Sequence, residues 1–208
     1  MEKPILLNTE EVKAILDGRK TMTRRAINAP ALKQVRDPNK IYWKNDQVIF
    51  QWHGDTIGEV AIKPPYQPGD ILWVRETWAK RIHSDNRYYY KADNNLGAIF
   101  NREDDKWRSP IFMPRAAARL FLEVKNVRVE RLQDISHEDA IAEGTLQWIC
   151  EEHKSGSYLD NAMRGAACAK PERAFALLWD TLNAKRGYPW ENNPWVWVYE
   201  FMRTEAMP

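Results

Sequence analysis

The sequence predicts an α+β fold built on a closed or nearly closed β-sheet. Three observations lead to this prediction: short β-prone segments recur along the chain, two or three short helical segments separate them, and the last β-prone segment, Trp195–Phe201, holds only one charge. Short strands with small helices at their ends are typical of one layered core. The 208 residues, 44% hydrophobic and 29% charged, suit one elaborated domain and exclude a disordered chain.

The first expected elements are an extended segment over Pro4–Leu7 and a helix that begins at Asn8 or Thr9. Either residue can cap the first amides, and two glutamates follow in the first turn, where the helix dipole favours them. Gly18 is placed to end this helix in a left-handed conformation. Lys20–Arg25 is then expected to be a strand or an extended exit from the helix.

The next segments predict a hairpin followed by a buried strand. Two β-prone pieces, Ile41–Trp43 and Val48–Trp52, predict a hairpin inserted within residues 28–63. The segment Tyr66–Asp70 contains a Pro-Gly pair, which is typical of a turn. The strand expected after this turn is Ile71–Val74.

The second half is expected to contain one long strand, two helices and a closing strand. Ala117–Val129 alternates as a half-exposed strand does. One helix is expected within residues 134–144, starting at a serine cap, and another over about 172–182. Residues 150–170 have little periodicity and indicate an excursion. Trp195–Phe201 is expected to be a central or barrel-closing strand.

The net charge of +2 hides two segments of opposite sign. Residues 18–40 hold seven bases and one acid, whereas residues 130–160 hold eight acids and two bases. The chain also has 10 Trp, 8 Tyr and 6 Phe, and dense arginine beside aromatic rings is typical of grooves that bind single-stranded nucleic acid. The alternative is that the two segments pair with each other. The near-neutral total excludes a duplex-DNA protein that depends on bulk positive charge.

The same sequence gives expectations about location and bound groups. Cys150 and Cys168 are too few for a secreted disulfide framework, and no signal-like segment begins the chain, so a cytoplasmic location is expected. No apolar run reaches the roughly 20 residues of a membrane helix, so no membrane partner is expected. The cysteines, with His137 and His153, lack the spacing of a zinc site, and no glycine-rich phosphate loop occurs. We therefore expect neither a metal nor a cofactor.

Four short motifs follow one another in a set order. They are Gly18–Arg24, Pro68–Asp70 before a strand, Ala140–Gly144 at a helix end, and the terminal Val198–Phe201. In this order they resemble the ASCH domain, in particular its larger members among phage and prophage proteins. The resemblance implies a single domain over residues 1–208, folded as a PUA-like mixed β-barrel with short helices at the barrel mouth, and a cleft for RNA or modified nucleosides. The implied insertions fall near 28–63, 88–107 and 147–170.

Within that family, small bacterial amidohydrolases that deacylate N(4)-acetylcytidine use a Lys, a Thr three residues later and a distant Glu. The resemblance assigns these catalytic roles to Lys20, Thr23 and Glu143. A threonine hydroxyl attacks once a base such as a buried lysine takes its proton, and Glu143 would pass a proton to the leaving amine. Because residues three apart in a strand point to opposite faces, Lys20 must lie in the turn after Gly18. The alternative is a structural Lys20–Glu143 bridge beside a cleft that only binds.

Further residues are candidates for nucleic-acid binding. Alternation along Trp73–Trp78 would place Trp73 beside Arg75, an arrangement suited to stacking a base and holding a phosphate. An Arg75 bridge to Glu143 or another carboxylate, with Trp73 in the core, is the alternative. The nucleic-acid candidates are Arg19, Arg24, Arg25, Trp73, Arg75, Glu76, Trp78, Arg115 and Arg119.

The expected function is therefore binding of single-stranded RNA or of a nucleoside. Its enzymatic forms are hydrolysis of an N(4)-acylated cytidine, or cleavage of single-stranded RNA with Lys20 and the arginines stabilising charge on the phosphate. A different class is a non-catalytic phage or prophage interaction protein that presents a tryptophan-rich surface to an unknown protein partner.

Overall fold

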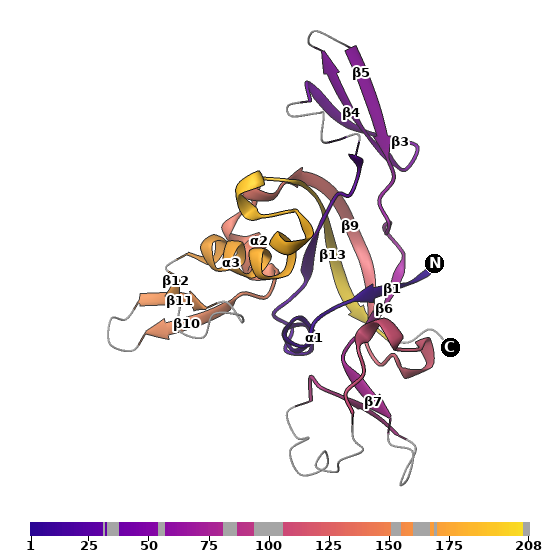
Figure 1. Ribbon diagram of the computed structural model, residues 1–208, viewed down its shortest axis with the longest axis vertical. Coiled ribbons are helices and arrows are strands. Elements are labelled where there is room, and N and C mark those ends of the chain that lie inside the picture. The colour runs from indigo at the N-terminus through magenta and orange to yellow at the C-terminus, as the bar shows by residue number, and fades with distance from the viewer. Residues whose placement is uncertain are drawn as a thin grey trace.

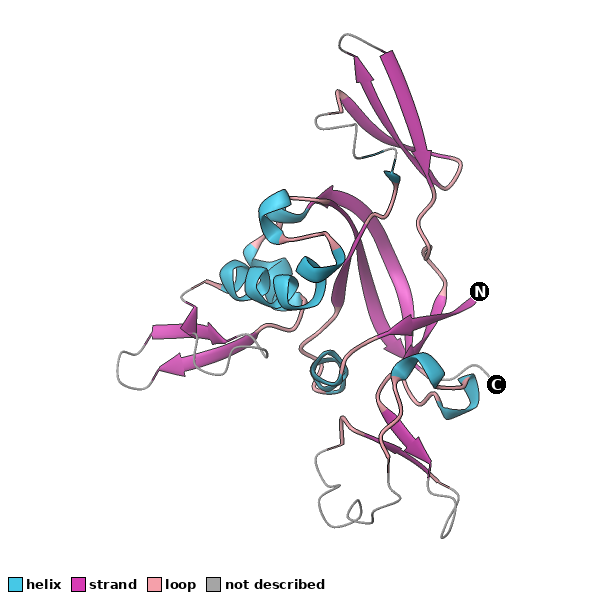
Figure 2. Cartoon of the chain, in the orientation of Figure 1, coloured by secondary structure: helices cyan, strands magenta, loops and turns pink. Residues whose placement is uncertain are grey.

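The computed structural model describes residues 1–30, 32, 38–53, 57–80, 87–93, 106–150, 155–159, 167–168 and 170–205. Its architecture is mixed α+β, with several sheets of short strands and a few short helices (Figures 1 and 2). None of the described helices is long and apolar enough to cross a bilayer.

Five strands form the central sheet in the order β1-β6-β9-β13-β2. Their bounds are β1 Glu2–Leu6, β2 Met22–Ala26, β6 Ile71–Arg75, β9 Phe121–Arg131 and β13 Trp195–Thr204. β1 runs parallel to β6, and the other neighbours are antiparallel. The long pair β9 and β13 is interrupted by a bulge between Glu200 and Phe201.

The predicted barrel is not closed in the part of the chain that the structure describes. β1 and β2 lie at the two edges of the central sheet, and no pairing of described strands joins them. A side chain spans the gap instead, since Arg25 Nη2 on β2 donates to the carbonyl oxygen of Leu6 on β1 at 2.9 Å. One edge of β2 therefore stays open.

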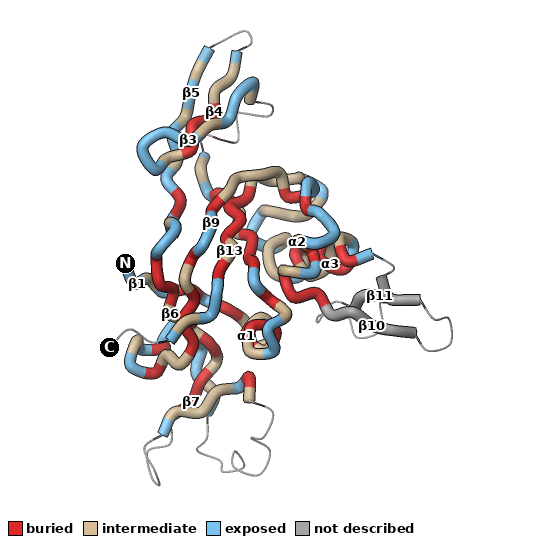
Figure 3. Tube along the Cα trace, turned by 180° about the vertical axis from the view of Figure 1, so that it is seen from behind, coloured by how far each residue is buried: buried red, intermediate tan, exposed pale blue. Residues whose placement is uncertain are grey.

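Alternation along β13 buries the sheet on both faces. Val196 and Val198 pack with the core of α2 and α3, whereas Trp197, Tyr199 and Phe201 pack with the core of α1. Figure 3 shows this strand as a buried segment between its neighbours. The sequence-based prediction of a central strand over residues 195–201 is thus confirmed.

The predicted helices are present, with the expected end signals. Their bounds are α1 Thr9–Leu16, α2 His137–Ala142 and α3 Pro171–Asn183, and the short 3-10 helices are η2 Pro110–Phe112, η3 Arg115–Ala117, η4 Leu132–Asp134, η5 Ala184–Arg186 and η6 Trp190–Asn192. Asn8 caps α1 in a capping box with Glu11, and Gly18 follows with φ +73°. Ser136 Oγ accepts the Asp139 amide at the start of α2.

Three smaller sheets project from the central one (Figure 1). They are β3 Lys40–Lys44, β4 Gln47–His53 and β5 Ile57–Ile62; β7 Trp78–Lys80 and β8 Tyr88–Tyr90; and β10 Leu146–Cys150, β11 Ser155–Leu159 and β12 Ala167–Cys168. The predicted hairpin is β3 with β4, and β5 adds a third strand. The excursion expected over 150–170 lies partly outside the described residues, and its described part pairs as an antiparallel sheet apart from the central one.

Candidate functional site

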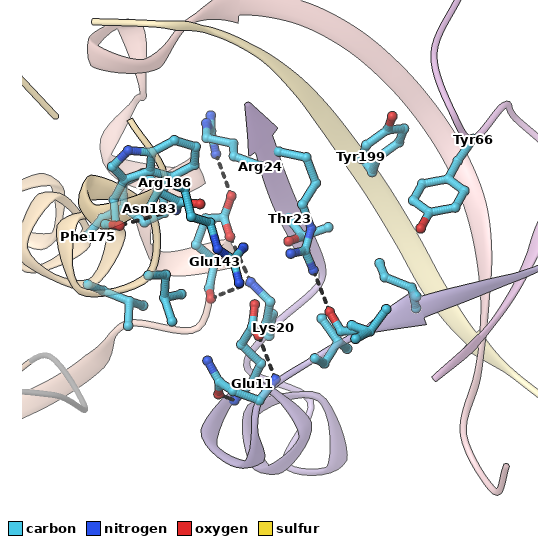
Figure 4. Close-up of a pocket in the computed structure, with 18 of the residues that line it drawn as sticks. Glu11, Lys20, Thr23, Arg24, Tyr66, Glu143, Phe175, Asn183, Arg186 and Tyr199 are labelled. Carbon is cyan, nitrogen blue, oxygen red and sulfur yellow. Dashed lines mark hydrogen bonds and ion pairs between the residues drawn. The ribbon is translucent and has the colours of Figure 1, made fainter. Parts of the chain in front are cut away.

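A cavity of about 480 Å³ lies beside β2, with α3 on one side and β1 and the start of α1 on the other (Figure 4). We call it the edge cavity. Its lining residues are Ile5, Leu6, Leu7, Asn8, Glu11, Lys20, Thr23, Arg24, Arg25, Pro65, Tyr66, Pro110, Glu143, Phe175, Leu178, Trp179, Leu182, Asn183, Arg186 and Tyr199. The volume falls within the range of about 300–1,000 Å³ that small-molecule sites occupy.

A buried ion pair forms part of the cavity wall. Lys20 Nζ donates to Glu143 Oε2 at 2.7 Å and to the Glu143 carbonyl oxygen at 2.9 Å, and the two side chains are 2% and 4% exposed. The turn after Gly18 positions Lys20, because the amides of Arg19 and Lys20 both donate to the carbonyl of Ala14. The structure thus contains the bridge foreseen as an alternative, and this bridge itself faces the cavity.

Arg24 connects Glu143 to two further acids. Its Nη1 donates to Glu143 Oε1 at 3.2 Å, its Nε and Nη2 donate to Glu130 Oε1 at 2.9 and 2.5 Å, and its Nη2 also donates to Asp139 Oδ2 at 2.6 Å. Burial alone would lower the pKa of the Arg24 guanidinium, but the carboxylates of Glu143 and Glu130 outweigh burial and raise it. Arg128 donates to the same two outer acids, Glu130 and Asp139. The basic and acidic segments therefore pair with each other, which neutralises Lys20 and Arg24.

The open edge of β2 adds unpaired polar groups. Thr23 pairs with Tyr199 of β13, lines the cavity and has no hydrogen-bond partner for its hydroxyl among the described residues. In an antiparallel pair of strands, hydrogen-bonded residue pairs alternate with pairs that are not hydrogen-bonded. Ile27 N–H donates to the Trp195 carbonyl and Phe201 N–H to the Thr21 carbonyl, which makes Arg24 and Val198 a pair without hydrogen bonds. The N–H and C=O of Arg24 consequently point away from β13, toward the open edge.

Two tyrosines form the wall on the β1 side. The rings of Tyr66 and Tyr199 meet edge to face at 5.1 Å, and Tyr66 Oη donates to the Pro4 carbonyl at 2.9 Å. The Tyr199 hydroxyl is buried without a hydrogen-bond partner among the described residues. Burial raises the pKa of this hydroxyl. A ligand that reaches Tyr199 would meet an unsatisfied polar atom.

One stripe of α3 forms the opposite wall. Phe175, Leu178, Trp179 and Leu182 recur at helical spacing and line the cavity, and the stripe continues to Asn183 and to Arg186 in η5. The sequence predicts a helix over about 172–182 but gives Asn183 and Arg186 no role in the site. Asn183 and Arg186 could have been found in the sequence, because they continue the helical spacing of Phe175, Trp179 and Leu182 beyond the last apolar residue. Only the packing of α3 beside β2 shows that this stripe faces a cavity.

Of the twelve residues predicted from sequence for the site, five line the edge cavity: Lys20, Thr23, Arg24, Arg25 and Glu143. The others lie outside it. Arg19 pairs with Asp17 at 2.8 Å, and Arg115 pairs with Glu2 at 2.8 Å.

The expected alternation from Trp73 to Trp78 ends at Arg75, where β6 stops. The Arg75 guanidinium does lie over the Trp73 ring, 5.4 Å from its centre, and its Nε is buried with no partner among the described residues, so the alternative bridge to Glu143 is not formed. Trp78 begins β7 and is buried. This tryptophan–arginine pair is separate from the cavity.

Glu76 and Arg119 form an ion pair with each other. Arg119 donates to the two carboxylate oxygens of Glu76 at 3.0 and 3.1 Å and to Asp93 at 2.6 Å, and its guanidinium lies 3.9 Å from the centre of the Tyr90 ring. Burial raises the pKa of Glu76, and Arg119 opposes this only in part. The cluster joins the β7–β8 sheet to the segment before β9.

Among the described residues, no group of three or more His, Cys, Asp or Glu side chains is placed to hold a metal ion. His137, one of the possible ligands, contacts Glu172 at 3.3 Å. His153 and the side chains of Cys150 and Cys168 lie outside the described residues.

No family model matches the chain, and no curated protein matches it. Among solved structures, the crystal structure of protein EF3133 from Enterococcus faecalis V583, of the family model DUF984, is similar over 93% of this chain and 67% of its own. The TM-score is 0.39 and the sequence identity is 9%. A similarity at this level carries no inference about fold family or function, and the ASCH and PUA-like assignment stays a prediction.

Proposed function

We propose that the edge cavity binds one nucleotide unit of a single-stranded RNA, or a modified nucleoside. The observation that supports this most is the cavity of about 480 Å³ beside an open strand edge, where buried polar groups with incomplete hydrogen bonding face apolar and aromatic walls. The resemblance of the chain to ASCH proteins with a PUA-like fold points to the same class of ligand.

The lining chemistry suits a nucleobase. A base needs flat apolar contact on its faces and hydrogen-bonding groups at its edge. Leu178 and Leu182 of α3 offer apolar contact, beside the almost fully buried rings of Phe175 and Trp179. Lys20 uses two of its three N–H donors on Glu143, so one remains, and the Thr23 hydroxyl can donate or accept. The main-chain groups of Arg24 add a donor and an acceptor.

The test is to fill the cavity and measure binding. Leu182→Trp places an indole in the α3 wall, and Thr181→Trp places the same indole on the exposed face of the same helix as a matched control. Calorimetric titration uses a short single-stranded RNA and a panel of nucleosides that includes N(4)-acetylcytidine. We expect the wild type and Thr181→Trp to bind alike and Leu182→Trp to lose at least tenfold in affinity. Equal binding by both variants would place the ligand elsewhere and refute the proposal.

Hydrolysis of an acylated base is a second candidate, favoured by the gathering of Lys20, Thr23 and Glu143 around one cavity. Lys20 would pass a proton to Glu143 across their 2.7 Å contact, and the neutral amine would take the Thr23 proton as the hydroxyl oxygen attacks the acyl carbon. The amide C–N bond then breaks as Glu143 protonates the departing nitrogen, and water releases the acid from the resulting ester. Thr23→Val should abolish acetate release, whereas Thr23→Ser, which keeps a hydroxyl at this position, should retain it. Release that survives this change would exclude Thr23 as the nucleophile.

The proposal of a non-catalytic interaction protein has less support. Trp43 is the tryptophan with a large exposed fraction, 47%, among the described residues, whereas Trp78, Trp179 and Trp197 are buried. A tryptophan-rich docking surface would need several exposed indoles together.

A further inference from the structure

The charged side chains of the edge cavity divide into paired and unpaired groups. Lys20 and Arg24 are bound to Glu143 and to acids behind it. Arg25 and Arg186 line the same cavity and form no ion pair among the described residues; Arg25 donates only to the Leu6 carbonyl, and Arg186 has no side-chain bond there. These two guanidiniums therefore remain available for an anionic ligand.

The two free guanidiniums come from opposite walls. Arg25 is on β2, held toward β1 by its bond to Leu6, and Arg186 is in η5, directly after α3. Figure 4 shows Arg186 on the α3 side of the Lys20–Glu143 pair, together with Phe175 and Asn183. A ligand that spans the cavity would thus meet one of these cations on each wall.

The remaining acid of the lining does not neutralise them. Glu11 Oε2 accepts the Asn8 amide in the capping box of α1, where the helix N-terminus already compensates its charge. Two unpaired guanidiniums match a phosphate monoester, which carries about −1.5 to −2 at neutral pH. Guanidinium groups also present their donors as a planar fork that fits phosphate oxygens.

We propose that the edge cavity selects a phosphorylated ligand, a nucleotide whose phosphate is held by Arg186 and Arg25 while its base lies against the apolar part of the α3 stripe. This inference rests on the proposed function and narrows it from nucleosides in general to nucleotides. The stripe supports the division of roles, because it changes from Phe175 and Trp179 to Asn183 and Arg186 along the helix. Arg186 is then the residue that distinguishes a nucleotide from a nucleoside.

The experiment compares each ribonucleoside with its 5′- and 3′-monophosphates, and with ribose 5-phosphate, by calorimetric titration. The proteins are the wild type, Arg25→Ala, Arg186→Ala and Lys185→Ala, the last removing a neighbouring exposed cation that does not line the cavity. We expect the wild type and Lys185→Ala to bind at least one monophosphate tenfold or more tightly than its nucleoside. Arg186→Ala should bind both forms with the affinity of the nucleoside, and Arg25→Ala should lose part of the preference.

The outcomes separate this inference from the proposed function. Nucleosides that bind as tightly as monophosphates, or an Arg186→Ala variant that keeps the preference, would overturn the phosphate assignment and leave the nucleoside site standing. Ribose phosphate that binds as tightly as the nucleotide would keep the phosphate assignment and overturn the base site. No binding of any of these probes to the wild type would overturn both.

Discussion

Glu143 is the residue on which the buried charges of the site converge. It accepts from Lys20 and from Arg24, and all three side chains are almost fully buried. Removing charges from water is costly, and each is tolerated because the others are present. The arrangement fixes the end of α2 against the turn before β2, which creates one wall of the cavity.

Glu143→Gln should therefore destabilise the protein strongly. The change leaves two buried cations without their shared carboxylate, and breaking such a pair costs about 3–5 kcal/mol. Urea unfolding gives the free energy, with Glu138→Gln, an exposed acid on the same helix, as control; the control should change it by less than about 0.5 kcal/mol. Similar losses in the two variants would contradict the assigned role of Glu143.

Asp70 gives a second residue-scale prediction, through pH. Its carboxylate accepts from Lys3 at 2.6 Å and from the Gln67 amide at 2.8 Å; burial would raise its pKa, but these bonds outweigh burial and lower it. A lowered folded-state pKa means that the stabilisation is complete above the unfolded-state pKa of about 3.9 and is lost as the pH falls through the folded-state value. Asp70→Asn should cost about 1.5–3 kcal/mol at pH 7, and the difference should close in acid.

Unfolding of both proteins across acidic to neutral pH measures this difference. Asp17→Asn, an exposed acid whose side chain is 58% accessible, is the control and should show a much smaller dependence. A gap between wild type and Asp70→Asn that stays constant with pH would show that ionisation of Asp70 is irrelevant.

At the scale of elements, the site is made where three chain segments meet at a glycine. Gly144 follows α2 with φ +86°, and a Cβ placed there would lie 3.0 Å from the Cβ atoms of Ala14 in α1 and Lys20 in the turn. The close approach lets α1, the turn and α2 converge behind the cavity. Gly187, at the end of η5, has a similar φ of +88° but open space around it.

Gly144→Ala and Gly187→Ala separate crowding from backbone strain. In both variants an alanine at positive φ should lower the free energy of unfolding by about 1–2 kcal/mol. Gly144→Ala should lower it by roughly 1–3 kcal/mol more, because the surrounding atoms must move. Thermal or urea unfolding measures both. Equal decreases in the free energy of unfolding would mean that α1 and the turn move at little cost. The close packing behind the cavity would then not contribute to stability.

The sequence predicted the individual helices and strands better than it predicted which of them lie side by side. Caps, periodicity and turns located α1, α2, α3 and β13, because those signals are local. β5 was missed because its sequence contains Gly58, which disfavours a strand, and because none of its side chains is fully buried. The site was predicted on β2 and at the end of α2, but Arg186 and Asn183 were not predicted, because no local feature shows which face of α3 lies beside the open edge of β2. Trp73, Glu76 and Arg119 were predicted for the site and lie elsewhere. β9 and β13 separate β6, which holds Trp73, from β2, and Glu76 pairs with Arg119 beyond the end of β6.

At the scale of the whole molecule, the basic and acidic segments form ion pairs with each other more than they form a charged groove on the surface. The net charge is +2, and the two buried cations of the predicted basic segment, Lys20 and Arg24, pair with carboxylates of the acidic segment. A long phosphate-binding groove would need many free cations on one surface.

Binding of single-stranded RNA should therefore depend only weakly on salt. With two free guanidiniums, Arg25 and Arg186, the slope of log K against log salt should be no steeper than about −1.4, since each phosphate contact contributes about −0.7 for single strands. Titrations across a range of salt concentrations give the slope. A slope of about −3 or steeper would indicate a phosphate-backbone groove outside the edge cavity.

A crystal structure of the protein with a bound nucleoside monophosphate tests the central claim most directly. We expect the base beside the open edge of β2, against the apolar part of the α3 stripe and within hydrogen-bonding distance of Lys20 Nζ or Thr23 Oγ1, with the phosphate at Arg186. A nucleotide bound on the β3–β5 sheet, or at the Trp73–Arg75 pair with the edge cavity closed by side chains, would contradict it.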